Sequence, residues 1–281
     1  MRRYFISGGT GLIGRVIVRN LLWRADTKSI VLLTRDAKAR QEIASWDKRI
    51  TLYEGDITET SFPSMPFTDV IHGANEVNDT LQPDQHHYYY TIVEGTNRIL
   101  RWAGERGIPR ILLLSSGAAQ RQTIYGRAKA SAERLAHFYN SRAKIARIYC
   151  VLGAAMPMAA DGQYAAGRFI WQALHEGKVR FYGGASERTY LHVSECAQWL
   201  LKILDDGPEL RPIDVAGSER ITIFSLAHLV GLVFGVPVER IAGPDRVDMY
   251  LPDLQEAEKL GLKQLRTIRQ SLEAIRAALV E

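Results

Sequence analysis

The sequence predicts an α/β fold built on a doubly wound, mostly parallel sheet. Short apolar, β-branched runs alternate with segments of helical period, and these runs are apolar at nearly every position, which is typical of strands buried on both faces. Strands are expected at residues 4–7, 29–34, 50–56, 69–75, 110–116 and 144–153. Apolar stripes at residues 12–21 and 93–103 predict helices that cover the sheet.

The rhythm of the chain changes after Gly153, where the expected elements become shorter and mixed. Helices are expected at residues 166–176, 194–204, 224–234 and 265–279, and strands at residues 178–182 and 213–215. Single cores stop growing efficiently near roughly 250 to 300 residues, so a length of 281 residues favours two lobes. We expect a first domain over residues 1–150 and a second over residues 151–281, part of which can return to the first sheet.

The composition is that of a globular protein, with 46% hydrophobic and 24% charged residues, which excludes a disordered tail. The net charge of +5 is spread along the chain, so we expect an anionic small molecule as partner rather than nucleic acid. Cys150 and Cys196 match no metal or disulfide spacing, and no apolar run reaches the roughly 18 to 20 residues of a membrane span. We therefore expect a soluble, cytoplasmic protein without a metal site.

Glycines directly follow the first expected strand. The run from Ser7 to Gly14 reads S-G-G-T-G-L-I-G and joins this strand to the first helix. Glycines at this place permit a tight turn, close approach of backbone N–H groups to a pyrophosphate, and close packing of helix on strand. The context predicts that residues 1–150 form a Rossmann-type NAD(P)-binding domain. The residues expected to contact the cofactor here are Gly8, Thr10, Gly11, Leu12, Ile13 and Gly14.

The ends of the second and third expected strands are predicted to bind the adenosine half of the cofactor. A carboxylate that accepts the ribose hydroxyls is usual at the end of the second strand, where this chain has Arg35 followed by Asp36. An Arg binds a 2′-phosphate that a carboxylate would repel, so NADP(H) is preferred, with Lys38 as a second contact. NAD(H) stays possible because Asp36 can serve as the ribose acceptor. Asp56 and Ile57 are placed to meet the adenine ring, although Asp56 is nearly as well suited to a turn or cap.

Three residues are candidates for proton transfer to a carbonyl. Tyr125 and Lys129 are separated by one helical turn and project from one face of a helix. A nearby ammonium favours the phenolate, which brings the phenol toward the range where it exchanges protons at neutral pH. Ser116 ends the strand before this helix and can hydrogen-bond the same substrate oxygen. The set of Ser116, Tyr125 and Lys129 predicts hydride transfer to a carbonyl or from an alcohol.

These motifs resemble the extended branch of the short-chain dehydrogenase/reductase superfamily, the NAD(P)-dependent epimerases, dehydratases and reductases of nucleotide sugars. The glycine run resembles that branch's T-G-G-x-G-x-x-G, the pair at 56–57 its adenine-site pair, and H-G-A-N at 72–75 its cofactor-flanking H-x-A-A turn. Ser116, Tyr125 and Lys129 match its catalytic set. The resemblance implies that Lys129 also holds the nicotinamide ribose. It further implies cofactor contacts at Gly73, Ala74 and Asn75.

The second lobe carries a segment that resembles a substrate-binding motif of this branch. R-T-Y-L-H-V at 188–193 resembles R-D-Y-x-H-V, whose Arg binds the pyrophosphate of a nucleotide-linked sugar. Arg188 is therefore expected to bind substrate together with Ser116, although an isolated Arg of this kind more often forms a surface salt bridge. The resemblance also implies a homodimer formed through the helices near 92–106 and 125–139.

Within the branch, the sequence most resembles reductases of nucleoside-diphosphate 4-keto-6-deoxy sugars. Gly117 and Ala118 stand where a 4,6-dehydratase carries an Asp-Glu pair, which argues against dehydratase activity. Arg35 favours reduction by NADPH over the alternative, an NAD-dependent nucleotide-sugar epimerase. A non-catalytic dinucleotide-sensing protein is the third possibility, because Tyr125 follows Ser116 by only nine residues and the family's V-Y-G is missing from that loop.

Overall fold

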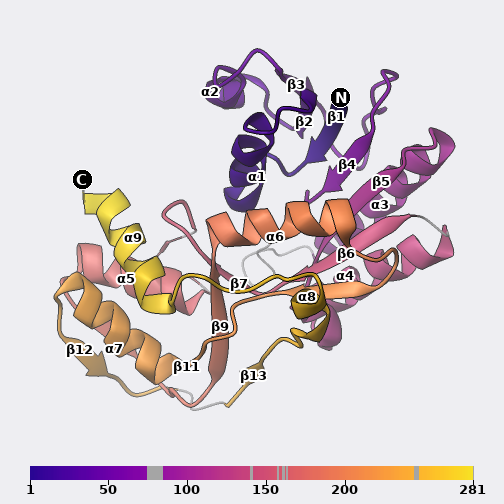
Figure 1. The fold of residues 1–281 in the computed structure, drawn as a ribbon. Helices are drawn as coiled ribbons and strands as arrows, with labels where there is room; N and C mark the ends of the chain where they lie inside the picture. Colours follow the sequence, from indigo (N-terminus) through magenta and orange to yellow (C-terminus); the bar gives the residue numbers. More distant parts are fainter. Residues whose placement is uncertain are drawn as a thin grey trace. The chain divides into compact units, whose positions relative to one another are not determined.

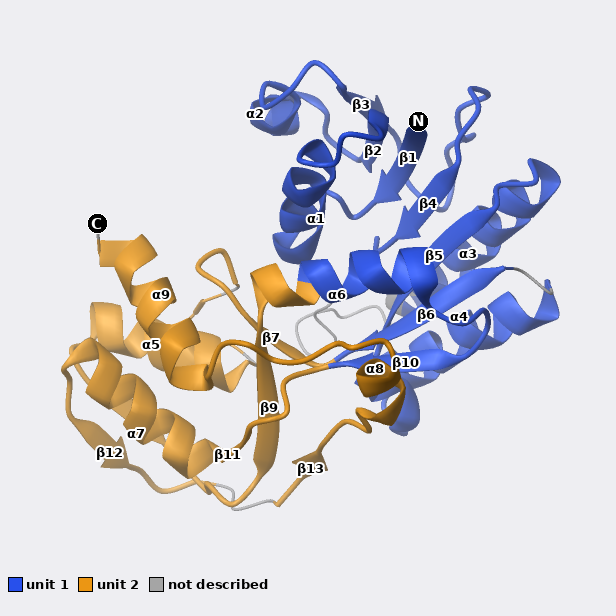
Figure 2. Cartoon of the chain, in the orientation of Figure 1, with its two compact units in different colours: residues 1–148, 197–215 blue, residues 149–196, 216–281 orange. Residues whose placement is uncertain are grey.

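The computed structural model describes residues 1–74, 85–139, 142–156, 158–159, 162, 164–243 and 247–280. The chain divides into two compact units, each made of two segments (Figure 2). Unit 1 comprises Met1–Ile148 and Ala197–Val215. Unit 2 comprises Tyr149–Cys196 and Ala216–Glu281.

Unit 1 is built on a sheet in which the described residues form seven parallel strands in the order β10-β6-β5-β4-β1-β2-β3 (Figure 1). These strands are β1 (Arg2–Ser7), β2 (Thr27–Thr34), β3 (Ile50–Glu54), β4 (Asp69–His72), β5 (Arg110–Ser116), β6 (Ala143–Ile148) and β10 (Pro212–Val215). The chain moves outward from β1 through β2 and β3, then returns to β4 on the other side of β1. Ligands of such sheets bind beyond the carboxyl ends of the strands at this reversal. The predicted Rossmann-type, doubly wound α/β fold is confirmed.

Helices connect these strands and cover the sheet. They are α1 (Leu12–Leu22), η1 (Lys38–Arg40), α2 (Gln41–Ala44), α3 (Gln85–Glu105), η2 (Gly117–Gln120), α4 (Ile124–Phe138) and α6 (Val193–Asp206), whose first residues belong to unit 2. Phe5 of β1 packs against Trp102 of α3, with 5.0 Å between ring centroids, inside a cluster that also contains Ala136 of α4. Over the part of the chain that the structure describes, no helix has the length and apolar composition needed to cross a membrane.

A buried carboxylate joins three strands at their amino ends. Asp69 begins β4 and is fully buried, and it accepts hydrogen bonds from Nε of Arg2 on β1 at 3.1 Å and Nε of Arg110 on β5 at 2.6 Å. Burial alone raises the pKa of Asp69, but the hydrogen bonds from Arg2, Arg110 and Thr68 outweigh it and hold the pKa below its usual value. The cluster therefore aligns β1, β4 and β5, whose opposite ends carry the predicted site residues.

Unit 2 is organised around β9 (Glu187–His192). This strand pairs in parallel with β7 (Cys150–Leu152) and β13 (Met249–Tyr250), and antiparallel with β11 (Arg220–Thr222). A second small sheet is formed by β8 (Val179–Phe181) and β12 (Val238–Arg240). The helices of this unit are α5 (Ala165–His175), α7 (Ile223–Phe234), α8 (Gln255–Lys259) and α9 (Ile268–Val280).

The single strand expected over residues 144–153 is wrong. The run is divided at Tyr149 into β6, which belongs to the seven-stranded sheet, and β7, which pairs with β9. Apolar residues continue from β6 through Tyr149 into β7, so the hydrophobic pattern contained no signal for this change of partner. The helix expected from residue 93 also begins earlier, since α3 starts at Gln85.

Candidate active site

The predicted phosphate loop is a tight connection between β1 and α1. Gly8 has a φ of +76°, which favours glycine, and the N–H of Gly11 donates to the carbonyl of Gly8 at 3.2 Å. α1 then begins at Leu12, and its N-cap residue is Gly11, which has no side chain with which to cap the helix. The loop therefore presents the N-terminal end of a helix at the carboxyl edge of the sheet, which is the arrangement that binds a pyrophosphate.

Two of the loop glycines are required by backbone packing. A Cβ at Gly14 would lie 2.2 Å from the carbonyl oxygen of Gly8, and one at Gly8 would lie 2.5 Å from the carbonyl carbon of Gly73. The N–H of Gly73 also donates to the carbonyl of Ser7 at 2.9 Å. The structure thus brings Gly73 and Ala74 beside the phosphate loop, although 65 residues separate Gly73 from Gly8. Asn75 lies outside the described residues.

A buried histidine links the loop to the helix behind it. Ser7 Oγ is 2.6 Å from Nδ1 of His72, and Nε2 of His72 is 3.1 Å from Oγ1 of Thr96 on α3. Burial, with a smaller contribution from the charge of Lys129, lowers the pKa of His72 to about 3. His72 is therefore neutral at physiological pH, and its ring connects the ends of β1 and β4 to α3.

Arg35, Asp36 and Lys38 are exposed at the end of β2. The carboxylate of Asp36 accepts a hydrogen bond from the N–H of Ala39 at 2.8 Å, so one of its oxygens stabilises the start of η1. Glu54 on β3 accepts from the N–H of Ala37 at 3.0 Å in the same way. Two cationic side chains, Arg35 and Lys38, are thus exposed at the strand end, and the carboxylates of Asp36 and Glu54 each accept a hydrogen bond from a backbone N–H group.

The predicted adenine-site pair follows β3. Oδ1 of Asp56 accepts from the N–H of Thr58 at 2.8 Å and from its hydroxyl at 2.6 Å, which is the turn role considered for this residue. Ile57 is buried, and its carbonyl accepts from Nε of Arg98 on α3 at 3.1 Å. An adenine contact at this pair stays a prediction.

The predicted catalytic residues lie on β5 and α4 of unit 1. Ser116 is the last residue of β5, and Lys129 is buried in α4, where its Nζ donates to the carbonyl of Leu114 at 3.0 Å. Nζ of Lys129 also lies 5.8 Å from the ring centroid of Tyr125. Burial lowers the pKa of Lys129 to about 8, and the charge of Glu133 opposes that fall. The amine therefore stays mostly protonated at neutral pH, close to the phenol.

The short connection between Ser116 and Tyr125 is ordered. Ser116 Oγ accepts a hydrogen bond from the N–H of Ala118 at 3.1 Å and caps η2. A Cβ at Gly126 would lie 2.3 Å from the carbonyl oxygen of Ala118, so η2 packs directly on the first turn of α4. Ala118 thus touches both the residue that carries the hydroxyl and the residue that follows the phenol. The sequence analysis did not identify Gly126, although a glycine directly after Tyr125 was the available signal.

Arg188 lies on β9 of unit 2 and is engaged with β13. Its Nη2 donates to Oδ2 of Asp248 at 2.8 Å, and its Nη1 donates to the carbonyl of the same residue at 2.7 Å. Arg188 therefore forms an ion pair in the structure, which was the alternative considered for it. Its binding of a pyrophosphate stays a prediction.

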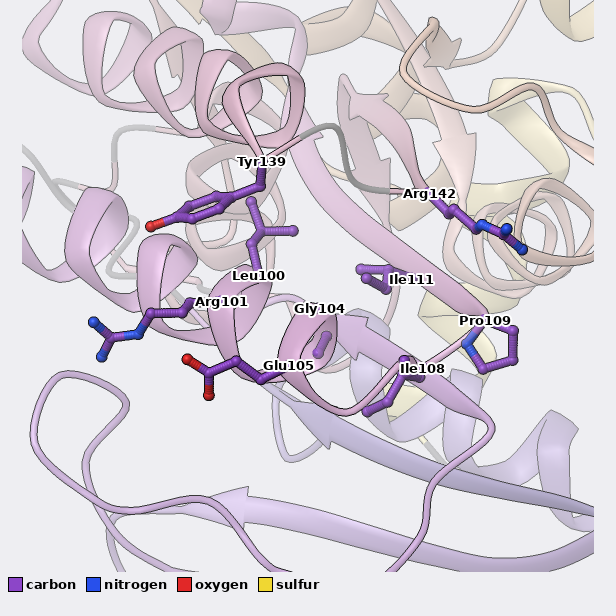
Figure 3. Close-up of a pocket in the computed structure, with 11 residues that line it drawn as sticks. Leu100, Arg101, Gly104, Glu105, Ile108, Pro109, Ile111, Tyr139 and Arg142 are labelled. Carbon is purple, nitrogen blue, oxygen red and sulfur yellow. The ribbon is translucent and has the colours of Figure 1, made fainter.

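A groove of about 610 Å³ lies near the amino end of β5. Figure 3 shows residues that line it. Its lining comes from the last turns of α3, from residues 107–109 and from Ile111 near the start of β5. Tyr139, after α4, closes one side. None of the predicted site residues lines this groove, so it is separate from the candidate active site.

Comparisons with known proteins identify the family of the chain and structures of similar fold. The model of the NAD dependent epimerase/dehydratase family matches residues 4–216. The fold is similar to that of the dTDP-glucose 4,6-dehydratase of Streptomyces venezuelae, solved with NAD and TYD bound, at 20% identity and a TM-score of 0.84, covering 98% of this chain and 96% of that one.

Two epimerase structures are similar as well. A UDP-galactose 4-epimerase has 21% identity and a TM-score of 0.78, covering 99% of this chain and 98% of that one. The UDP-glucuronic acid 4-epimerase of Bacillus cereus, in complex with NAD, has 18% identity and a TM-score of 0.84, covering 99% and 98%. No curated protein matched the sequence. Since the family model matches most of the chain, the protein belongs to the NAD dependent epimerase/dehydratase family.

Proposed function

We propose that the protein reduces a nucleoside-diphosphate 4-keto-6-deoxyhexose to the 6-deoxyhexose with NADPH. In this reaction the carbonyl carbon C4 gains a hydride and its oxygen gains a proton. Tyr125 donates the proton, Ser116 hydrogen-bonds the developing alkoxide, and Lys129 favours proton release by the phenol. Arg188 binds the pyrophosphate of the substrate, where its planar fork matches two phosphate oxygens.

The observation that carries the proposal is the pairing of a buried amine with a half-buried phenol at the carboxyl end of β5. Nζ of Lys129 lies 5.8 Å from the Tyr125 ring, and the pKa of about 8 leaves the amine mostly charged at pH 7. A charged amine in this low-dielectric place lowers the cost of forming a phenolate when the proton leaves Tyr125. This supports Tyr125 as a general acid.

The residues around the phosphate loop fit a nicotinamide dinucleotide. The backbone packing at Gly8 and Gly14 leaves no room for side chains, and α1 begins directly behind the loop. A bound nicotinamide dinucleotide supplies the hydride. We propose NADPH because Arg35 and Lys38 are exposed at the end of β2, where a 2′-phosphate is recognised, while Asp36 is engaged by the N–H of Ala39.

Reduction is favoured over elimination by the residues that follow Ser116. Gly117 and Ala118 form the start of η2 and carry no carboxyl group with which to protonate a leaving hydroxyl. In the resembling 4,6-dehydratases an Asp-Glu pair stands there. The chain therefore lacks that acid at this place.

The proposal is tested with purified protein and a panel of dTDP-, GDP-, CDP- and UDP-4-keto-6-deoxy sugars. Loss of the absorbance of reduced nicotinamide is followed with NADPH and with NADH, and the sugar formed is identified. We expect consumption of NADPH in step with formation of one 6-deoxy sugar. Tyr125→Phe is expected to lower the rate at least about 100-fold, with cofactor binding retained. Tyr139→Phe is the matched control. Tyr139 directly follows α4, and its hydroxyl donates a hydrogen bond to Oδ1 of Asn97.

Two other functions give different results in the same assay. An NAD-dependent nucleotide-sugar epimerase, which the family membership favours, would interconvert 4-hydroxy sugars without added NADPH and would carry bound cofactor after purification. A dinucleotide-sensing protein would bind NADPH without turnover of any sugar, and Tyr125→Phe would change nothing. Either result would replace the reductase proposal.

We also propose that the protein is a cytoplasmic homodimer assembled through α3 and α4. Tyr90 on α3 and Phe138 on α4 support this, because both large rings are more than half exposed. Analytical ultracentrifugation of the protein and of Phe138→Glu tests the assembly. A monomer at micromolar concentration, unaffected by the substitution, would contradict it.

A further inference from the structure

A buried ion pair lies one helical turn beyond Lys129. Glu133 of α4 accepts hydrogen bonds from Nε and Nη2 of Arg147 on β6, at 2.9 and 2.6 Å, and from the hydroxyl of Ser115 on β5 at 2.5 Å. Only 8% of the Glu133 side chain is exposed. We call Ser115, Glu133 and Arg147 the Glu133 cluster. The sequence analysis did not include any of these residues in the site.

The cluster connects the elements that carry the proposed proton-transfer residues. Tyr125, Lys129 and Glu133 follow one another at intervals of four residues, so they share one face of α4. Ser115 precedes Ser116 on β5 and is paired in register with Arg147 on β6. Each member of the cluster is thus bonded or adjacent to an element that holds Ser116 or Lys129.

The cluster also supplies the negative charge nearest to the amine along the helix. Its carboxylate accepts three hydrogen bonds, two of them from the guanidinium of Arg147, and these bonds hold the group in place. Burial lowers the pKa of Lys129, and the charge of Glu133 raises it. Two other groups interact with this amine, namely the ring of Tyr125 on the same helix and the neutral His72 at the end of β4. Arg147 is paired with Glu133.

We propose that Glu133 is a positioning residue of the active site, which keeps the Lys129 side chain charged and fixes α4 on the end of β5. The inference deepens the proposed function, on which its catalytic meaning rests. Arg147 and Ser115 hold the carboxylate in place. Without Glu133, the buried ammonium would lose the negative charge that raises its pKa, and it would release its proton more readily.

The test measures the protonation of Lys129 without substrate. The protein is labelled with 13Cε-lysine, and the Lys129 signal is identified by its loss in Lys129→Met. We expect titration near pH 8 in the unsubstituted protein. In Glu133→Gln, which keeps the shape of the side chain, we expect the midpoint to fall by at least about one pH unit. Asp206→Asn is the matched control, because it removes the carboxylate of the exposed Lys202–Asp206 pair on α6.

A second variant keeps the test valid if Glu133→Gln does not fold. Glu133→Gln/Arg147→Gln removes both charges of the ion pair. Its Lys129 midpoint is expected to fall as well, by less than in the single variant. A midpoint unchanged in either folded variant would overturn the proposal.

The outcome is independent of whether a sugar substrate is found. If the midpoint falls but no sugar of the panel is reduced, the proposed function fails and the role of Glu133 in charging Lys129 stands. If a sugar is reduced, the alkaline limb of the kcat profile is expected to move to lower pH in Glu133→Gln. A uniform loss of kcat at every pH, with an unchanged lysine titration, is the result of a merely structural role and would contradict the proposal.

Discussion

The hydroxyl of Ser7 donates a hydrogen bond to Nδ1 of His72, and this direction is fixed by the other end of the ring. Thr96 Oγ1 donates to the carbonyl of Ile92 at 2.8 Å, so it accepts the proton of His72 Nε2. Nδ1 is then unprotonated and accepts from Ser7 at 2.6 Å. The residue before the phosphate loop is thereby held by a neutral imidazole of defined tautomer.

Protonation of His72 is expected to destabilise the protein in acid. The pKa is about 3 in the folded protein and 6.5 in an unfolded chain, so the unfolded chain binds more protons between these values. The free energy of unfolding is therefore unaffected by titration of His72 above pH 6.5 and decreases as pH falls toward 3. The expected decrease at pH 5 is about 2 kcal/mol. His72→Asn keeps an acceptor for Ser7 and lacks this titration. Urea unfolding should show that the difference in free energy of unfolding between the unsubstituted protein and His72→Asn is smaller at pH 5 than at pH 7. An equal difference at both pH values would contradict the lowered pKa of His72.

Replacement of Lys129 by Met is expected to stabilise the fold and to abolish turnover. The folded-state pKa of about 8 lies below the ordinary 10.5, so burial of this amine destabilises the protein below pH 8, and the penalty disappears as pH rises toward 10.5. Lys129→Met also loses the hydrogen bond to Leu114, which offsets part of the gain. The free energy of unfolding at pH 7 should therefore increase by about 2 kcal/mol. Denaturant unfolding at pH 7 and pH 10 measures it. A less stable variant at pH 7 would argue against a buried ammonium.

Two glycine substitutions are expected to act in opposite directions. The Cβ of Gly14→Ala meets the backbone oxygen of Gly8, so the variant should lose about 2 kcal/mol or more and bind dinucleotide poorly. Gly104→Ala on α3 has no heavy atom within 4 Å of its Cβ and should gain up to about 1 kcal/mol from helix propensity. Thermal unfolding and NADPH fluorescence titration compare them. Equal NADPH affinity in both variants would remove Gly14 from the proposed cofactor site.

Arg35→Asp is expected to weaken NADPH binding by roughly 10-fold or more and NADH binding far less, because the new carboxylate repels a 2′-phosphate. Lys48→Asp is the control, since Lys48 is exposed before the amino end of β3. Isothermal titration calorimetry of each variant with NADPH and with NADH gives the ratio of the two dissociation constants. Equal losses for NADPH and NADH would refute the 2′-phosphate assignment.

The central sheet was predictable because its signal is local. Strands such as β5, expected at 110–116 and found at Arg110–Ser116, are apolar at nearly every position and begin and end at polar or turn residues. The glycine run of the phosphate loop was predictable for a related reason, since it lies within one strand-turn-helix, where Gly14 packs on the backbone of Gly8 and Gly9. Gly73 required the family resemblance, because the chain that approaches Gly8 comes from the next strand of the sheet.

Other features depend on partners distant in sequence, and no local pattern predicted them. Glu133 is one charged residue among several on α4, and its burial depends on Arg147 of β6 and Ser115 of β5. Arg188 was expected as a phosphate ligand, while the structure pairs it with Asp248, the residue directly before β13, a strand of two residues. The spacing of Tyr125, Lys129 and Glu133 was visible in the sequence, but only tertiary contacts distinguish it from a solvated helix face.

The interleaving of the two units has a consequence for any attempt to shorten the protein. β10 comes from the segment Ala197–Val215 and pairs along β6 from Ile145 to Ile148. A fragment that stops near residue 150 would leave the backbone N–H and C=O groups of β6 without that neighbour. Uncovered strands of this kind recruit other chains, so the shortened polypeptide should aggregate unless the later segment is supplied in trans.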